Sequence, residues 1–159
     1  MNLTKANIRD LKKVTVKIEC SNGSEGSGTI VAVGDVVYIL TAAHIIENDA
    51  KDGYLGEDQI GVSMTRNSQK LVFKVAKVVY YDRKDDATVM IATYSGDTSL
   101  SGIDRVRLLT SSVNGPAEFC GFHKGDKTPK HYAFEHRGEN SWAVINIQLN
   151  VQSGKNRAS

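Results

Sequence analysis

Residues 26–46 read GSGTIVAVGDVVYILTAAHII and contain the clearest structural pattern in the chain. Two runs of β-branched and apolar residues, 28–33 and 36–42, are separated only by Gly34 and Asp35. Strands of this composition joined by two turn-forming residues are typical of a tight antiparallel hairpin. The stretch therefore predicts two paired strands, followed by a short helical turn within AAHIIEN (42–48).

Strand-like segments continue on both sides of this hairpin. Upstream, residues 14–20 (VTVKIEC) alternate apolar and polar side chains, as a half-buried strand does. The next segment, SNGSEGSG (21–28), is rich in Gly and Ser and predicts a turn. Downstream, further segments have the composition of strands. They are residues 59–64, 70–81, 87–94, 105–109, 116–122, 130–136 and 141–151.

Residues 95–104 (SGDTSLSGID) divide the strands into a group of six and a group of four. A segment so rich in Ser, Gly and Asp favours a connection between two halves. Many short strands without a long helix are typical of an all-β protein. We therefore expect two consecutive six-stranded antiparallel β-barrels, an N-terminal one in residues 1–94 and a C-terminal one in 95–159. The second would be incomplete, and the chain would be the front part of a longer protein.

The composition is that of a soluble, folded protein, because 40% of the 159 residues are hydrophobic and 24% are charged. A net charge of +2 is too small to indicate nucleic-acid binding. No apolar run approaches the roughly 20 residues that span a bilayer, and residues 1–16 lack the apolar core of a signal peptide. We therefore expect a cytoplasmic protein with neither a nucleic-acid nor a membrane partner.

The two cysteines, Cys20 and Cys120, are far apart in the sequence. Neither has another Cys or a His at the spacing of a metal site, and two cysteines do not make a disulfide framework. We expect two buried thiols and no structural zinc.

The order of Gly26-Ser27-Gly28, a hairpin and Thr41-Ala42-Ala43-His44 resembles the opening of the trypsin-like (chymotrypsin-fold) serine peptidases. Residues 120–126 (CGFHKGD) are similar to the Gly-aromatic-Pro-x-Gly turn of the second barrel in bacterial and organelle relatives, with His123 in the place of Pro. Ile45 follows His44 where secreted relatives often have a Cys, so the resemblance is to an intracellular, disulfide-free branch.

The resemblance implies that His44 is the general base of a catalytic triad. In that family an Asp at the start of an apolar strand, some forty residues further on, orients the imidazole. Here DDATVMI (85–91) has this form, and Asp86 lies 42 residues after His44. We therefore expect Asp86 to be the orienting carboxylate, with Asp85 as the alternative.

The resemblance implies a serine nucleophile, and three candidates remain because the family signature Gly-x-Ser-Gly does not occur in the sequence. Ser159 lies 73 residues after Asp86, near the spacing of the family, and is our first choice. Ser153, which precedes Gly154, is the second, and a serine beyond the recorded end is the third. Cys120 is disfavoured as a nucleophile, because it lies only 34 residues after Asp86 and inside a predicted strand.

The activity implied by the resemblance is that of a serine endopeptidase, which cleaves a protein or peptide substrate through an acyl-enzyme. Such a reaction needs no metal or organic cofactor. The missing signature leaves a second hypothesis, an inactive two-barrel module that binds peptides or proteins. A third is an unrelated β-barrel interaction domain. For the endopeptidase and for the inactive module alike, the expected partners are a protein or peptide ligand and other domains of a longer chain.

Overall fold

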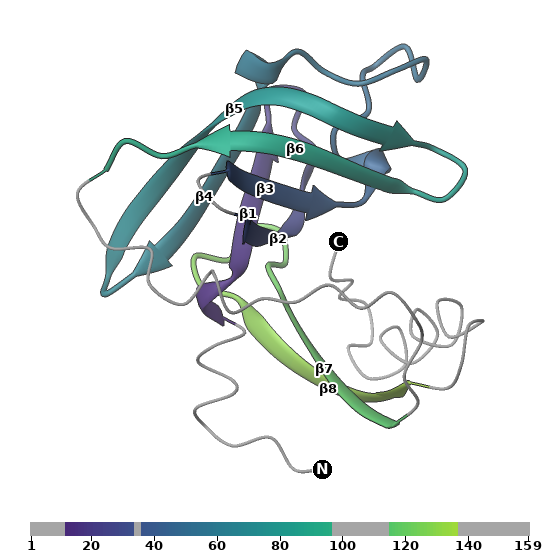
Figure 1. Cartoon of the computed structure of the whole chain (residues 1–159). Helices are drawn as coiled ribbons and strands as arrows, with labels where there is room; N and C mark the ends of the chain where they lie inside the picture. The colour runs from purple at the N-terminus through teal and green to yellow at the C-terminus, as the bar shows by residue number, and fades with distance from the viewer. Residues whose placement is uncertain (1–11, 34–35, 97–114, 137–159) are drawn as a thin grey trace.

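The computed structural model describes residues 12–33, 36–96 and 115–136. Within these residues, six strands form a closed antiparallel barrel in the order β1-β2-β3-β6-β5-β4, and two more form a separate hairpin (Figure 1). The barrel strands are β1 Thr15–Cys20, β2 Glu25–Val33, β3 Val36–Thr41, β4 Ile60–Arg66, β5 Gln69–Asp82 and β6 Ala87–Thr93. The hairpin strands are β7 Gly115–Gly121 and β8 Lys130–His136, and two short 3-10 turns are η1 Ala43–Ile45 and η2 Glu57–Gln59.

The all-β class and the six-stranded first barrel are therefore confirmed. Of the second expected barrel, β7 and β8 are present as a two-stranded sheet. The strands expected at 105–109 and 141–151, and most of the connection expected at 95–104, lie outside the described residues.

The barrel closes around a core of branched and aromatic side chains, because alternate residues of each strand face inward. In β1, Val16 and Ile18 are fully buried, whereas Lys17 and Glu19 face outward. In β5 the alternation fails twice, and a register irregularity occurs at both places. The innermost side chains include Val16, Ile18, Ile30, Ile39, Val62, Phe73 and Met90.

Strand β2 begins at Glu25, three residues before the expected start, so part of the segment expected to be a turn is paired with β1. The glycine at position 28 explains why a Gly-rich stretch continues the strand. A Cβ atom on Gly28 would lie 2.9 Å from the carbonyl oxygen of Leu40 and 3.1 Å from Cδ1 of Ile18. Only glycine permits this close approach of β2 to its neighbours.

The side chain of Ser27 links the barrel to the residue that follows β7. The hydroxyl of Ser27 accepts a hydrogen bond from the backbone N–H of Phe122 at 2.5 Å, and the carbonyl of Ser27 accepts one from Thr41 Oγ1 at 2.7 Å. The Gly-Ser-Gly motif thus joins β2, β3 and the end of β7.

Among the described residues, no helix has the length and apolar character needed to cross a membrane. Cys20 and Cys120 are both buried, and they are not joined in a disulfide.

Candidate active site

The side chains of His44 and Asp86 meet at one end of the barrel. His44 Nδ1 lies 2.8 Å from Asp86 Oδ2, and the backbone N–H of His44 donates to Asp86 Oδ1 at 2.9 Å. Both oxygens of one carboxylate therefore hold a single residue. The topology accounts for this meeting: β3 and β6 are neighbours, Thr41 pairs with Thr88, and His44 follows β3 while Asp86 immediately precedes β6.

The 3-10 turn η1 presents His44 to solvent. Its flanking residues, Ala43 and Ile45, are fully buried and anchor the turn on the core, whereas the His44 side chain is 57% exposed. The carbonyl of Ile45 accepts hydrogen bonds from Ser24 Oγ at 2.7 Å and from Cys20 Sγ at 3.4 Å. The core and the β1–β2 turn therefore hold the backbone that carries the imidazole.

Cys20 contributes to this support as a protonated thiol. Burial raises its pKa from 9.0 to about 11, so the thiolate does not form at neutral pH.

On the other side of the pair, a polar turn presents Asp86. The carboxylate of Asp82 accepts hydrogen bonds from the backbone N–H of Asp85 at 3.2 Å and from that of Lys84 at 2.9 Å. Both bonds lower the pKa of Asp82, and the bond from Asp85 is the larger cause. Asp86 then takes a left-handed backbone conformation, with φ of 51°. Asp tolerates this region better than most residues do. The turn thus directs Asp86 to His44, and Asp85 is exposed.

Three further contacts tie the segment after His44 to the β5–β6 hairpin that carries Asp86. Arg83 Nε lies 3.0 Å from Glu47 Oε2 in an ion pair. The hydroxyl of Tyr81 donates to the carbonyl of Gly53 at 3.3 Å, and its ring lies against that of Tyr54 with centroids 5.1 Å apart. Burial is the main cause that raises the pKa of Tyr81, which keeps its hydroxyl a donor. No local sequence pattern predicts these contacts, because the partners are 27 to 36 residues apart.

The arrangement suits His44 to accept a proton at its outer nitrogen. A carboxylate oxygen only accepts hydrogen bonds, so the nitrogen that faces it, Nδ1, carries the hydrogen, and Nε2 of a neutral ring keeps its lone pair. The carboxylate of Asp86 is 31% exposed and is therefore less accessible than the ring of His44. When the ring takes up a proton at Nε2, the adjacent negative charge stabilises the cation.

The remaining candidates are placed differently. Ser159 and Ser153 lie outside the described residues. Cys120 is buried near the end of β7. His123 is also buried, and its Nδ1 lies 3.5 Å from Asp126 Oδ2.

That second His–Asp contact belongs to a turn. The carboxylate of Asp126 accepts the backbone N–H of His123 at 3.0 Å, and the backbone N–H of Asp126 donates to the carbonyl of His123 at 3.0 Å. Gly125 provides the positive φ, 83°, that this tight turn contains. Within the described ranges, no three His, Cys, Asp or Glu side chains gather as a set of metal ligands.

Comparison of the sequence with models of protein families and with curated proteins gives no match.

Proposed function

We propose that the protein is a serine endopeptidase of the trypsin-like type. The observation that carries the proposal is the pair of hydrogen bonds between Asp86 and His44. Asp86 Oδ2 lies 2.8 Å from His44 Nδ1, and Asp86 Oδ1 accepts the backbone N–H of His44 at 2.9 Å. A general base needs a fixed tautomer and a stabilised cation, and this carboxylate supplies both. The exposure of the imidazole, 57%, leaves room for a nucleophile and a substrate beside it.

In the proposed reaction, His44 Nε2 removes the proton of a serine hydroxyl as the oxygen attacks the peptide carbonyl carbon. The same nitrogen then donates that proton to the leaving amine, and the acyl-enzyme forms. Water, activated by His44 in the same way, hydrolyses the ester and restores the serine. Asp86 keeps the ring oriented through both steps and carries no proton itself. The reaction needs no metal or organic cofactor.

The proposed nucleophile is Ser159, with Ser153 and a serine beyond the recorded end as alternatives. The substrate is a protein or a peptide, and other domains of a longer chain are proposed partners. The cytoplasm is the proposed location, and a second barrel that includes β7 and β8 completes the proposed fold.

Labelling with a fluorophosphonate tests the proposal, because this probe phosphonylates only an activated serine. The wild-type protein should label, His44→Ala should abolish the label, and peptide mass spectrometry should locate it. A label on Ser159 that disappears in Ser159→Ala supports the first choice. A label on another serine moves the nucleophile there and keeps the mechanism. Equal labelling of wild type and His44→Ala would refute it.

The sequence favours one alternative, a non-catalytic module of this fold that binds peptides. The observation behind it is the absence of Gly-x-Ser-Gly from the chain. A folded wild-type protein that binds an extended peptide, but neither labels nor cleaves it, would favour this function over catalysis.

A further inference from the structure

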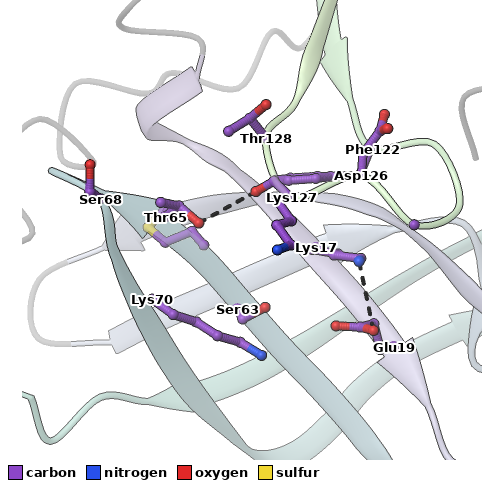
Figure 2. A pocket seen from close by; sticks show the side chains of 12 residues that line it. Lys17, Glu19, Ser63, Thr65, Ser68, Lys70, Phe122, Asp126, Lys127 and Thr128 are labelled. Atoms are coloured by element: carbon purple, nitrogen blue, oxygen red, sulfur yellow. Dashed lines mark hydrogen bonds and ion pairs between the residues drawn. The ribbon is translucent and has the colours of Figure 1, made fainter.

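A second candidate site lies at the other end of β5 from the His44–Asp86 pair. There the outer face of β1, β4 and β5 and the loop after β7 enclose a pocket of about 460 Å³ (Figure 2). Lys70 is the second residue of β5, whereas Asp82, its last residue, pairs with Ala87 beside Asp86. The volume is within the range of ligand sites, which is roughly 300–1,000 Å³.

Lysines from three different elements line this pocket. Lys17 comes from β1, Lys70 from β5 and Lys127 from the loop between β7 and β8. Figure 2 shows their side chains around one space, with the hydroxyl of Ser63 among them. The strand register explains the grouping, because Lys17 pairs with Ser63 and Lys70 pairs with Thr65 on the outer face of the barrel.

The acidic side chains of the pocket are already engaged. Glu19 Oε2 lies 3.7 Å from Lys17 Nζ, on the same face of β1. The carboxylate of Asp126 accepts the backbone N–H of His123 at 3.0 Å and lies 3.8 Å from Lys130 Nζ.

In the part of the chain that the structure describes, the ion pairs leave Lys70 and Lys127 without a carboxylate partner. Thr65 Oγ1 donates to the carbonyl of Lys127 at 3.4 Å and so holds the loop against β4. Both lysines are exposed, and they line the same pocket from β5 and from the loop that Thr65 holds.

An apolar side chain completes the lining. Phe122, which is 3% exposed, contributes to the pocket wall, whereas the side chain of Met64 packs into the barrel core behind it. A pocket of about 460 Å³ has room for more than an inorganic anion. Lysine ammonium groups bind carboxylates, as they bind phosphates, through single charged contacts. An acidic peptide supplies such carboxylates and fills the remaining space.

We propose that this pocket binds an acidic peptide segment, with carboxylates on Lys70 and Lys127 and an apolar side chain beside Phe122. The site is separate from the His44–Asp86 pair and does not depend on peptidase activity. In a peptidase it would hold a part of the substrate remote from the scissile bond; in a binding module it would be the recognition site itself.

The test is direct binding, measured by calorimetry, of the capped peptide Glu-Phe-Glu-Glu and of its neutral counterpart Gln-Phe-Gln-Gln. The double variant Lys70→Gln, Lys127→Gln should weaken binding of the acidic peptide by about five- to tenfold. Lys74→Gln is the matched control, because Lys74 is exposed on the same strand but lies outside the pocket. It should change the affinity less than about twofold.

Amide NMR signals of Phe122 and Gly125 should shift as the acidic peptide is added, and 0.5 M salt should weaken binding. Equal affinity for the neutral peptide would overturn the proposal, as would equal losses in the double variant and in Lys74→Gln. Inorganic phosphate that binds as tightly as the peptide would replace the peptide with a small anion as the ligand. Absence of binding by the folded wild type refutes the site, whatever the outcome of fluorophosphonate labelling.

Discussion

Asp86→Asn separates the chemistry of the His44–Asp86 pair from its structure. Asn has the size of Asp and tolerates the left-handed φ of 51°, so the turn before β6 should keep its shape. The amide oxygen still accepts one N–H of His44. The negative charge that fixes the tautomer and stabilises the imidazolium is lost, however.

The expected effects on stability and on rate differ greatly in size. A contact as exposed as this one contributes about 0–1 kcal/mol to folding, so Tm should fall by no more than about 4 °C. Loss of the carboxylate from a Ser-His-Asp triad reduces turnover by about 10⁴-fold, or roughly 5.5 kcal/mol in the barrier. Almost all of the effect should therefore appear in the transition state.

The assay is the rate of fluorophosphonate labelling, measured beside thermal unfolding of the same samples. Asp85→Asn is the matched control, because it removes the same charge one residue away, at an exposed position that does not contact His44. Wild-type labelling by Asp86→Asn would refute the role of the carboxylate. Equal loss in Asp85→Asn would show that general electrostatics, and not the contact with His44, supports the rate.

Three other predictions concern the surroundings of the pair. Arg83→Gln removes the ion pair with Glu47 and should lower kcat several-fold with little change in KM. The control Lys84→Gln removes the neighbouring charge and should change neither constant. An equal effect of both variants would contradict the role of the ion pair. Gly28→Ala should lower the free energy of unfolding in urea by about 1–3 kcal/mol, because the new Cβ would lie 2.9 Å from the backbone carbonyl oxygen of Leu40. At Gly53 the nearest atom would be 3.5 Å away, so Gly53→Ala should unfold with nearly the wild-type free energy. The raised pKa of Cys20 means that the folded state favours the neutral thiol, so its contribution to stability should be complete below pH 9 and fall as the pH rises toward 11. Urea unfolding at pH 8 and pH 10.5 measures this loss, and Cys20→Ala should reduce the difference.

The strands of the barrel could be predicted because burial on one face imposes a period of two on the sequence. Residues 14–20 follow that period closely, and β1 forms there. The irregularities of β5 could not be predicted from the sequence. Two consecutive exposed residues, at 76–77 and again at 79–80, interrupt the alternation, and the reason is apparent only from the pairing with β6, whose register shifts at these places. The early start of β2 at Glu25 was missed for a related reason: local composition indicates a turn, and the pairing with β1 overrides it.

The site shows the same division between local pattern and tertiary context. A His after one strand and an Asp before another are visible in the sequence, and the neighbouring positions of β3 and β6 bring them together. Two adjacent carboxylates at a strand entrance cannot be told apart by spacing. The left-handed turn at Asp86 distinguishes them, and that turn depends on the Asp82 hydrogen bonds behind it.

Asp86 is one of four non-glycine residues in the described ranges that have a positive φ, with Lys51, Asn67 and Ser68, so the conformation marks a turn and the contact with His44 must carry the argument for function. Positive φ costs most non-glycine residues about 1–2 kcal/mol and Asp somewhat less, and a contact as exposed as that of His44 with Asp86 contributes no more than about 1 kcal/mol. The contact with His44 therefore adds little net stability, although Ser24, Arg83 and Tyr81 all help to hold the segments that make it. Support of this kind is what the proposed general base requires. Variants of the pair should accordingly lose reactivity without losing the barrel.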